Sequence, residues 1–223
     1  MTETACRAAF AHEPQAQRGR QRLLARLEAS GISNQQVLEV VAEIPRHWFI
    51  DEALGTRAYE DSALPIGHGQ TISQPYIVAR MTELLLESGP CSTVLEIGTG
   101  SGFQAAVLAM LVRRVYTIER LAALWGLAEP RLRALKLRNV RYRHGDGRLG
   151  WPEMAPFDGI IMTAASEGIP RGLAEQLTLG GCMVLPLVVG AGQRLVRLTR
   201  TRSGFRHEDL EPAMFVPLLG GLG

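Results

Sequence analysis

The segment VLEIGTGSG (residues 94–102) carries the residues whose types and spacing most clearly indicate chemistry. Gly98, Gly100 and Gly102 fall where a buried strand is expected to turn into a helix. Without Cβ atoms, the backbone there can turn tightly and lie close against a ligand. Glu119 ends the next expected strand, where a carboxylate can accept hydrogen bonds from both ribose hydroxyls of an adenosine. A glycine turn alone is a weak signal, and Glu119 could be a solvated strand end, but together they favour nucleoside binding.

Glu96 indicates which nucleoside would bind, because it lies two residues before the first glycine of a GxGxG loop. A carboxylate so close to the loop would repel a pyrophosphate. It suits the cationic amino-acid end of S-adenosylmethionine, directly or through water. The alternative is that Glu96 caps a loop amide. Asp146, between glycines in HGDG, can accept a hydrogen bond from the exocyclic amine of adenine or form an Asx-turn. Asp158, in PFDGII, is expected to anchor its strand rather than to touch a ligand.

The elements that must position these residues follow from the hydrophobic pattern after residue 91. Short apolar runs alternate with helical patterns, which predicts an α/β fold with a doubly wound, mostly parallel sheet covered on both faces. We expect strands over residues 92–97, 115–119, 140–146, 157–165, 180–189, 194–201 and 213–218, and helices over 103–112, 121–137 and 170–177. Pro130 must kink or split the second of these helices.

The N-terminal part is expected to be a helical extension of this sheet. We predict a loose tail over residues 1–16 and a single domain over 17–223, with a helical and loop-rich part over 17–90 and the sheet over 91–223.

The extension itself is predicted to contain helices over 17–30, 33–44 and 75–88. Gly31 would stop the first helix, and a capping box of Ser33 and Gln36 would start the second. Residues 46–74 are rich in turn formers, and a loop-rich stretch of this length in a compact chain is usually functional.

Composition excludes several classes of protein. The chain has 223 residues, 46% of them hydrophobic, and a formal net charge of +2, which is too mild to argue for a nucleic-acid partner. Cys6, Cys91 and Cys182 are widely spaced, so we expect no zinc site and no disulfide framework, and a reducing cytoplasm fits. No signal-peptide pattern and no membrane-length apolar run is visible. We expect a cytoplasmic monomer without a metal.

Several motifs, in order, carry a family resemblance. VLEIGTGSGFQAAVLA, VYTIER, HGDG, APFDGIIMTAA and QLTLGGCMVLPL resemble the successive motifs of Rossmann-like class I methyltransferases. AYEDSALPIGHGQTISQPYIVARM resembles the signature of protein-L-isoaspartate O-methyltransferases, and the closing MFVPL resembles that family's last strand. The resemblance runs from about Val37 to Leu218, which is most of the chain.

The resemblance implies S-adenosylmethionine as methyl donor, proteins and peptides with L-isoaspartyl residues as acceptors, and a cytosolic repair role. It places the catalytic serine at Ser73 and an acceptor pocket at Ser73 and the backbone near Val216 and Pro217. It implies cofactor contacts at Thr71, Ile72, Gly98, Gly100, Gly102, Glu119, Asp146 and Gly147. The sequence departs from the family at Phe103, where tyrosine is usual, at Pro130, and in TAAS, where TAAP is often seen.

Ser73 fits the chemistry of such a reaction. An ionised carboxylate is already a nucleophile at neutral pH, so the protein must mainly hold an acceptor oxygen about 3 Å from the methyl group. Ser73 would donate a hydrogen bond that orients the carboxylate, and N–H groups of the following helix would favour the anion. The alternative is an ordinary helix N-cap before Pro75. His47 and His68 are each isolated, so neither is expected to act as a base.

Three other functions stay open at the level of sequence. A nucleic-acid methyltransferase of this fold often carries an Asn/Asp-Pro-Pro-Tyr motif, where this chain has TAAS. A binding protein could keep the cofactor pocket and have lost catalysis, although the TIS and GDG segments are intact. A nicotinamide oxidoreductase is disfavoured by the GxGxG spacing and by Glu96.

Overall fold

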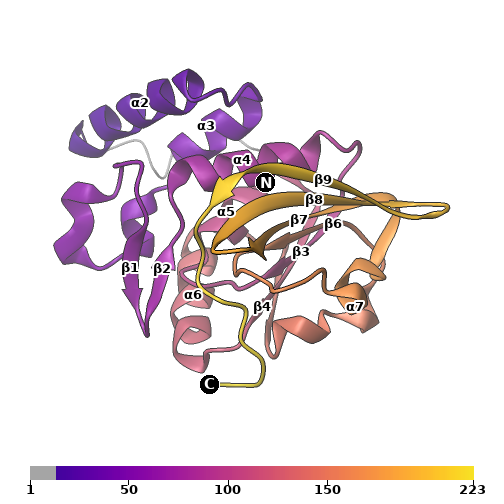
Figure 1. Cartoon of the computed structure of the whole chain (residues 1–223). Coiled ribbons are helices and arrows are strands. Elements are labelled where there is room, and N and C mark those ends of the chain that lie inside the picture. The colour runs from indigo at the N-terminus through magenta and orange to yellow at the C-terminus, as the bar shows by residue number, and fades with distance from the viewer. Residues whose placement is uncertain (1–13) are drawn as a thin grey trace.

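The computed structural model describes residues 14–223, and its elements are labelled as in Figure 1. Most of the tail predicted over 1–16 lies outside the described residues. Helix α2 (Pro14–Ala29) begins inside that predicted tail, with a proline in its first turn, where the missing N–H would be unpaired in any case. Gly31 has φ of +97°, which confirms the predicted stop.

The main sheet has seven strands within residues 14–223, in the order β5-β4-β3-β6-β7-β8-β9. The strands are β3 (Thr93–Ile97), β4 (Arg114–Glu119), β5 (Val140–His144), β6 (Phe157–Met162), β7 (Leu177–Val189), β8 (Gly192–Thr201) and β9 (Gly204–Ala213). Strands β3 to β7 pair in parallel, whereas β8 and β9 are antiparallel additions at one edge. The chain runs outward in both directions from β3 and β6, so the sheet is doubly wound. The predicted fold class is confirmed.

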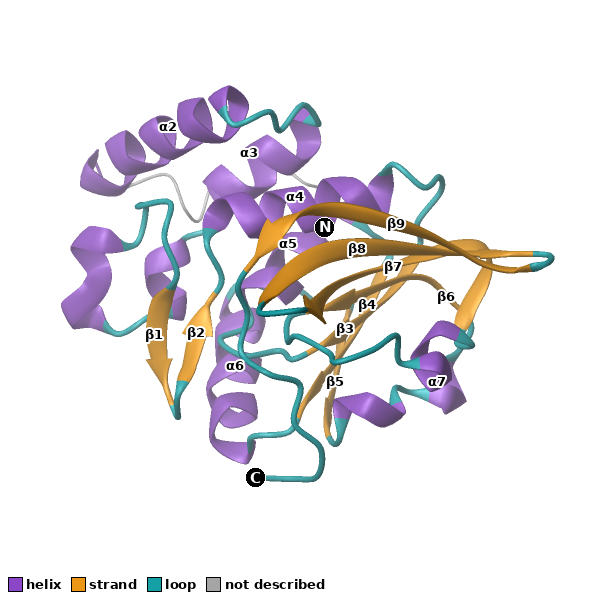
Figure 2. Ribbon diagram, viewed as in Figure 1, coloured by secondary structure: helices purple, strands orange, loops and turns teal. Residues whose placement is uncertain are grey.

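Helices lie on both sides of this sheet (Figure 2). They are α3 (Gln35–Glu43), α4 (Pro75–Leu86), α5 (Phe103–Leu111), α6 (Ala122–Ala134) and α7 (Arg171–Ala174), with short 3-10 turns η4 (Gly147–Leu149) and η5 (Pro152–Met154). Val94 packs into the core cluster that contains α3, α4 and α5, while its neighbour Leu95 packs into the cluster that contains α7. Burial of both faces explains why the parallel strands read as continuous apolar runs.

The start of α3 differs from the prediction. Asn34 caps the helix by accepting a hydrogen bond from the Val37 amide at 3.2 Å. Ser33 is engaged elsewhere, because its amide and its hydroxyl donate to Glu83 Oε1 at 2.8 and 3.1 Å. The predicted capping box of Ser33 and Gln36 is therefore wrong, since a long-range carboxylate takes the serine.

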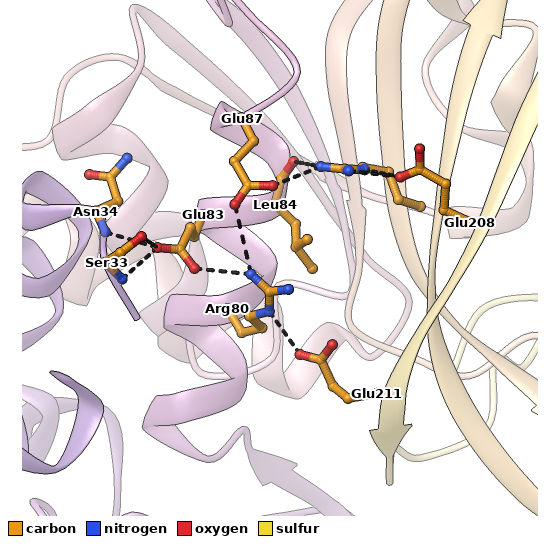
Figure 3. Close-up of polar contacts among 9 residues, drawn as sticks. Ser33, Asn34, Arg80, Glu83, Leu84, Glu87, Glu208 and Glu211 are labelled. Carbon is orange, nitrogen blue, oxygen red and sulfur yellow. Dashed lines mark hydrogen bonds and ion pairs between the residues drawn. The ribbon is translucent and has the colours of Figure 1, made fainter. Parts of the chain in front are cut away.

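An ionic network ties α4 to the antiparallel edge of the sheet (Figure 3). Arg80 of α4 pairs with Glu211 of β9 at 2.9 Å. Arg197 of β8 pairs with Glu87, the C-cap of α4, at 2.9 Å and with Glu208 of β9 at 2.7 Å. Because α4 directly follows the turn that contains the predicted catalytic serine, this network also bears on the position of that turn.

The strand predicted over 213–218 is wrong, because β9 ends at Ala213. Strand β9 pairs only with β8, none of its residues is buried, and half of them are polar. An edge strand of this kind lacks the apolar alternation that sequence analysis detects.

Two helices also differ from the prediction. Helix α7 is much shorter than the segment predicted over 170–177, because the Gln176 carbonyl and Leu177 already pair with Phe157 of β6. Helix α6 runs through Pro130 without being split.

The loop-rich stretch over 46–74 contains two 3-10 turns, η2 (Arg46–Phe49) and η3 (Glu52–Arg57). A hairpin of β1 (Leu64–Gly67) and β2 (Gln70–Ile72) follows and stands beside the main sheet (Figure 1). It leads directly into the turn before α4. In the part of the chain that the structure describes, no helix is long and apolar enough to span a membrane.

Candidate active site

A pocket opens at the switch point of the sheet, beyond the carboxyl ends of β3 and β6. Its space is about 850 Å³ when the open mouth is included. It is lined by nine of the predicted site residues: Thr71, Ile72, Ser73, Gly98, Gly100, Glu119, Gly147, Val216 and Pro217. Gly102 and Asp146 are not among the lining residues.

The glycine loop after β3 needs its glycines. Gly98, Gly100 and Gly102 have φ of +92°, +54° and +92°, a region that costs other residues roughly 1–2 kcal/mol each. Gly102 occupies the N-cap position of α5, so it shapes the loop without lining the pocket. The Gly98 amide donates to the Ile118 carbonyl at 2.8 Å, which holds the loop against the end of β4.

Glu119, at the end of β4, is positioned by that loop. Its side chain is buried and accepts hydrogen bonds from the amides of Gly100 at 2.8 Å and Leu121 at 2.9 Å. It is therefore not a solvated strand end. Each carboxylate oxygen has about two lone-pair sites, so each can still accept one more hydrogen bond. A ribose with two neighbouring hydroxyls could supply these two donors.

Glu96 lies behind the loop rather than in the pocket. Its side chain is fully buried, one oxygen accepts from the Thr117 hydroxyl, and the other has no hydrogen-bond partner among the described residues. Burial raises the pKa of Glu96 to about 8, against the opposing effect of the Thr117 hydrogen bond. Thr117 bonds Thr99 at 2.6 Å, and Thr99 lines the pocket. Glu96 therefore does not face the pocket for a direct contact with a ligand, and a contact through water stays a prediction. The alternative of a loop-amide cap is wrong.

Asp146 caps the turn after β5. Its oxygens accept from the Arg148 amide at 2.9 Å, the Gly221 amide at 2.7 Å and the Arg148 guanidinium at 3.1 Å. Burial acts to raise the pKa of Asp146, but these hydrogen bonds outweigh it and lower the pKa. This geometry is the Asx-turn alternative, and a contact with adenine stays a prediction. The next residue, Gly147, lines the pocket, where a Cβ would lie 2.5 Å from Ile97 Cγ2.

The segment after β9 closes one side of the pocket. The Ala165 amide donates to the Val216 carbonyl at 2.8 Å, and the Leu218 amide donates to the Ala165 carbonyl at 2.7 Å. The chain then runs toward α6 (Figure 1), where the Gly223 amide donates to the Arg120 carbonyl at 3.0 Å. The segment around Val216 and Pro217, predicted to bind the acceptor, is therefore hydrogen-bonded to the loop after β6.

Ser73 lies half-buried in the turn between β2 and α4, facing the pocket. Its hydroxyl has no hydrogen-bond partner among the described residues, so it is available to a ligand. The N-cap of α4 is Gln74, without a side-chain cap bond, so the alternative of Ser73 as N-cap is wrong. Asp61 accepts from the Tyr76 amide at 2.8 Å and from the Gln74 side chain at 3.0 Å. That helix amide is not free for an acceptor anion, contrary to our expectation.

The other candidates lie away from the pocket. His47 bonds the Tyr59 hydroxyl at 2.9 Å, and His68 is exposed at the tip of the β1–β2 hairpin. Asp158 accepts from the amides of Ser92 and Thr93, at 3.0 and 2.9 Å, which confirms it as a strand anchor. Over residues 14–223, no group of three or more His, Cys, Asp or Glu could hold a metal ion.

Sequence reasoning missed several residues that line the pocket. They are Gln70, Val78, Ile97, Thr99, Ser101, Gln104, Ile118, Arg120, Leu121, Leu124, Thr163, Ala164, Leu218 and Leu219. Phe103, where the sequence departs from the family, also lines the pocket. Thr163 could have been found, because it directly follows β6 at the switch point. Leu121 and Leu124 carried no signal, since apolar residues at the start of a helix usually belong to the core.

The residues present fit S-adenosylmethionine. The glycine loop lets backbone approach a ligand closely, and Glu119 offers acceptors for two ribose hydroxyls. Leu121 and Leu124, which follow Glu119 in the chain, add apolar lining suited to a nucleobase.

The doubly wound sheet, the glycine loop after β3, the Glu119 carboxylate and the pocket at the switch point together define an α/β methyltransferase that uses a nucleoside cofactor. The sequence profile of the family described as protein-L-isoaspartate(D-aspartate) O-methyltransferase matches residues 17–223. The chain belongs to this family.

Relatives and solved structures agree. The protein-L-isoaspartate O-methyltransferases of Pseudomonas paraeruginosa and Pseudomonas fluorescens are each 56% identical over 205 residues, which is 92% of this chain and 97% of theirs. A solved protein-L-isoaspartate O-methyltransferase superposes with a TM-score of 0.81 at 27% identity, over 92% of this chain and 67% of that one. A Plasmodium falciparum structure in complex with S-adenosyl-L-homocysteine gives 0.78 at 24% identity, over 89% and 97%, and shows the shared fold.

Proposed function

We propose that this protein transfers a methyl group from S-adenosylmethionine to the free α-carboxylate of L-isoaspartyl residues in damaged proteins and peptides. The observation that carries the proposal is one pocket shared by three features: the Glu119 carboxylate, the free Ser73 hydroxyl and the Val216–Pro217 segment. Cofactor and acceptor can therefore meet in one place. Family membership gives the chemical class of the acceptor.

The residues act by positioning. When bound, S-adenosylmethionine supplies a methyl group already activated by the sulfonium charge. Glu119 and the glycine loop hold the nucleoside end of the pocket, and Ser73 donates a hydrogen bond to one oxygen of the acceptor carboxylate. The acceptor needs no base, because a carboxylate is ionised at neutral pH. Neither His47 nor His68 lines the pocket, which is consistent with a reaction that needs no histidine as base.

Selectivity for isoaspartate follows from its geometry. In isoaspartate the main chain runs through the side-chain carbonyl, so the free group is the α-carboxylate. A bent, extended peptide can enter between the turn at Ser73 and the segment at Val216 and Pro217, with few demands on side chains. The resulting methyl ester is open to attack by the neighbouring amide nitrogen, which expels methanol and forms a succinimide. Hydrolysis of the succinimide returns part of the material to normal aspartate.

We further propose that the protein acts as a cytoplasmic monomer on proteins and peptides rather than nucleic acid. Cys91 and Cys182 are free thiols, which suits a reducing compartment. A formal net charge of +2 offers little attraction for a phosphate backbone.

The test uses methyl-labelled S-adenosylmethionine with a synthetic peptide that contains L-isoaspartate, and the same peptide with normal L-aspartate as control. The readout is base-labile label released as volatile methanol. Label on the isoaspartyl peptide alone is the expected result. Equal label on both peptides would leave a carboxyl methyltransferase without a repair role. No label on either, with S-adenosyl-L-homocysteine still bound, would point to a binding protein that has lost catalysis.

A further inference from the structure

The turn that carries Ser73 is held by a residue from elsewhere in the chain. Asp61 lies between η3 and β1. One of its carboxylate oxygens accepts a hydrogen bond from the Tyr76 amide and the other accepts one from the Gln74 side chain, so it binds two residues of the turn. A carboxylate at a helix N-terminus is also favoured by the helix dipole. Asp61 therefore serves as the cap that the local sequence of α4 does not provide.

Asp61 lies near a buried cation, the guanidinium group of Arg46. Arg46 is fully buried, and its guanidinium donates to the carbonyl of Ser62, the neighbour of Asp61, at 3.2 Å. Its Nε and Nη1 atoms have no hydrogen-bond partner among the described residues. Burial lowers the pKa of Arg46 to about 9, against the opposing attraction of Asp61. Because burying an unpaired charge is costly, the attraction of the Asp61 carboxylate offsets part of the cost of burying Arg46.

The same arginine reaches the cofactor side of the pocket. Its guanidinium carbon lies 5.0 Å from the centre of the Phe103 ring, in a cation–π contact, and Phe103 opens α5 directly after the glycine loop. Asp61 and Arg46 thus connect the turn that bears the acceptor-binding serine with the helix that follows the cofactor loop. Neither residue lines the pocket, so neither is placed to touch a ligand.

The Ser73 hydroxyl has no bond of its own to fix it, so its direction depends on the backbone of the turn. We propose that Asp61 is a positioning residue of the acceptor site: it holds the turn from Ser73 to Tyr76 so that the hydroxyl faces the acceptor carboxylate. The inference rests on the proposed function. It predicts that loss of Asp61 impairs use of the peptide but not binding of the cofactor.

The test compares three variants: Asp61→Ala, Asp61→Asn and Asp158→Ala. Asp158 is a matched control, because it also accepts two hydrogen bonds from distant residues, but at the amino end of β3, away from the pocket. Asp61→Ala is expected to lower kcat/KM for the isoaspartyl peptide by between about tenfold and 100-fold, while the Kd of S-adenosyl-L-homocysteine stays within about twofold. Asp61→Asn keeps an oxygen for the Tyr76 amide and should recover most of the peptide activity. Asp158→Ala should change neither constant.

Other outcomes would overturn the inference. If Asp61→Ala retains wild-type kcat/KM, or if it weakens peptide turnover and cofactor binding equally, Asp61 does not position the acceptor site. If Asp61→Ala does not fold, Gln74→Ala decides, because it removes only the 3.0 Å side-chain contact. Wild-type kcat/KM in that variant would contradict the proposal. Inactivity of the wild-type protein on isoaspartyl peptides would instead refute the proposed function.

Discussion

Ser73 and Glu119 contribute to the site in opposite ways. The Ser73 hydroxyl makes no hydrogen bond within the described chain, so it can donate a hydrogen bond to a ligand in the pocket. The Glu119 carboxylate is already bonded to two loop amides, so it shapes the pocket before anything binds. Removing each side chain should therefore affect different measurements.

Replacing Ser73 with alanine should lower kcat for the isoaspartyl peptide between about tenfold and 100-fold, because the acceptor carboxylate loses its orienting donor. The free energy of unfolding should change by less than about 0.5 kcal/mol, since no internal hydrogen bond is lost. Methanol release and denaturant titration measure the two quantities. Ser203→Ala, in the exposed β8–β9 turn, is the control. Full activity of Ser73→Ala would rule out the orienting role.

Replacing Glu119 with glutamine should raise the Kd of S-adenosyl-L-homocysteine at least about tenfold, because hydrogen bonds to a charged acceptor contribute roughly 1.5–3 kcal/mol. The new amide group also faces a loop N–H and cannot accept from it. Calorimetric titration measures the Kd. Glu129→Gln, whose carboxylate pairs with Arg133 on α6, serves as control. Equal Kd values in the two variants would contradict the assignment of Glu119 to the ribose.

Glu96 predicts a dependence of stability on pH. Burial raises its pKa from 4.5 to about 8, so between these values the unfolded chain releases a proton that the folded chain keeps. The contribution of Glu96 to the free energy of unfolding should therefore fall as pH rises from about 5 to 8, by at most about 1.4 kcal/mol per unit. Denaturant titrations of wild type and Glu96→Gln should diverge over this window. Parallel curves would show that Glu96 is ionised in the folded protein.

At the scale of elements, the acceptor side depends on how α4 meets β9. Helix α4 begins two residues after Ser73, and β9 ends three residues before Val216. Strand β9 is an edge strand that pairs only with β8, so its connection to α4 is made by side chains. The pair of Arg80 and Glu211 does this (Figure 3).

Replacing Glu211 with glutamine should raise KM for the peptide by about threefold to fivefold, since a half-exposed ion pair contributes up to about 1 kcal/mol. Glu208→Gln is a matched control, because Glu208 pairs with Arg197 in the same network at similar exposure, 28% against 26%, but farther from the acceptor segment. It should lower stability to a similar extent and leave KM within about twofold. Equal KM values for the two variants would show that the Glu211 contact is only structural.

Across the whole molecule, sequence patterns correctly predicted the features that depend on residues close together in the chain. The apolar runs around Val94 and Leu95 predicted a parallel sheet because both faces of those strands are buried. The glycine loop and Glu119 followed from the geometry of a strand-to-helix turn. Their placement in one pocket with Ser73 needed the fold, because β2 and β3 are separated by a helix.

Several errors arise from contacts between distant residues. Ser33 was assigned to a local capping box, but Glu83, 50 residues away, takes it. The role of Asp61 at the start of α4, 15 residues on, has no local signature. Glu96 lies on a strand whose two faces cannot be told apart from the sequence, so its burial behind the loop could not be predicted.

If one pocket brings a methyl donor to the α-carboxylate of isoaspartate, the methyl group must be found on that carboxylate. A peptide with one L-isoaspartate, one normal aspartate and a free C-terminus would be incubated briefly with the protein and S-adenosylmethionine, then sequenced by tandem mass spectrometry at mildly acidic pH. The methyl ester is expected on the isoaspartyl residue alone. A methyl group on the normal aspartate, on the C-terminus or on a nitrogen would contradict it.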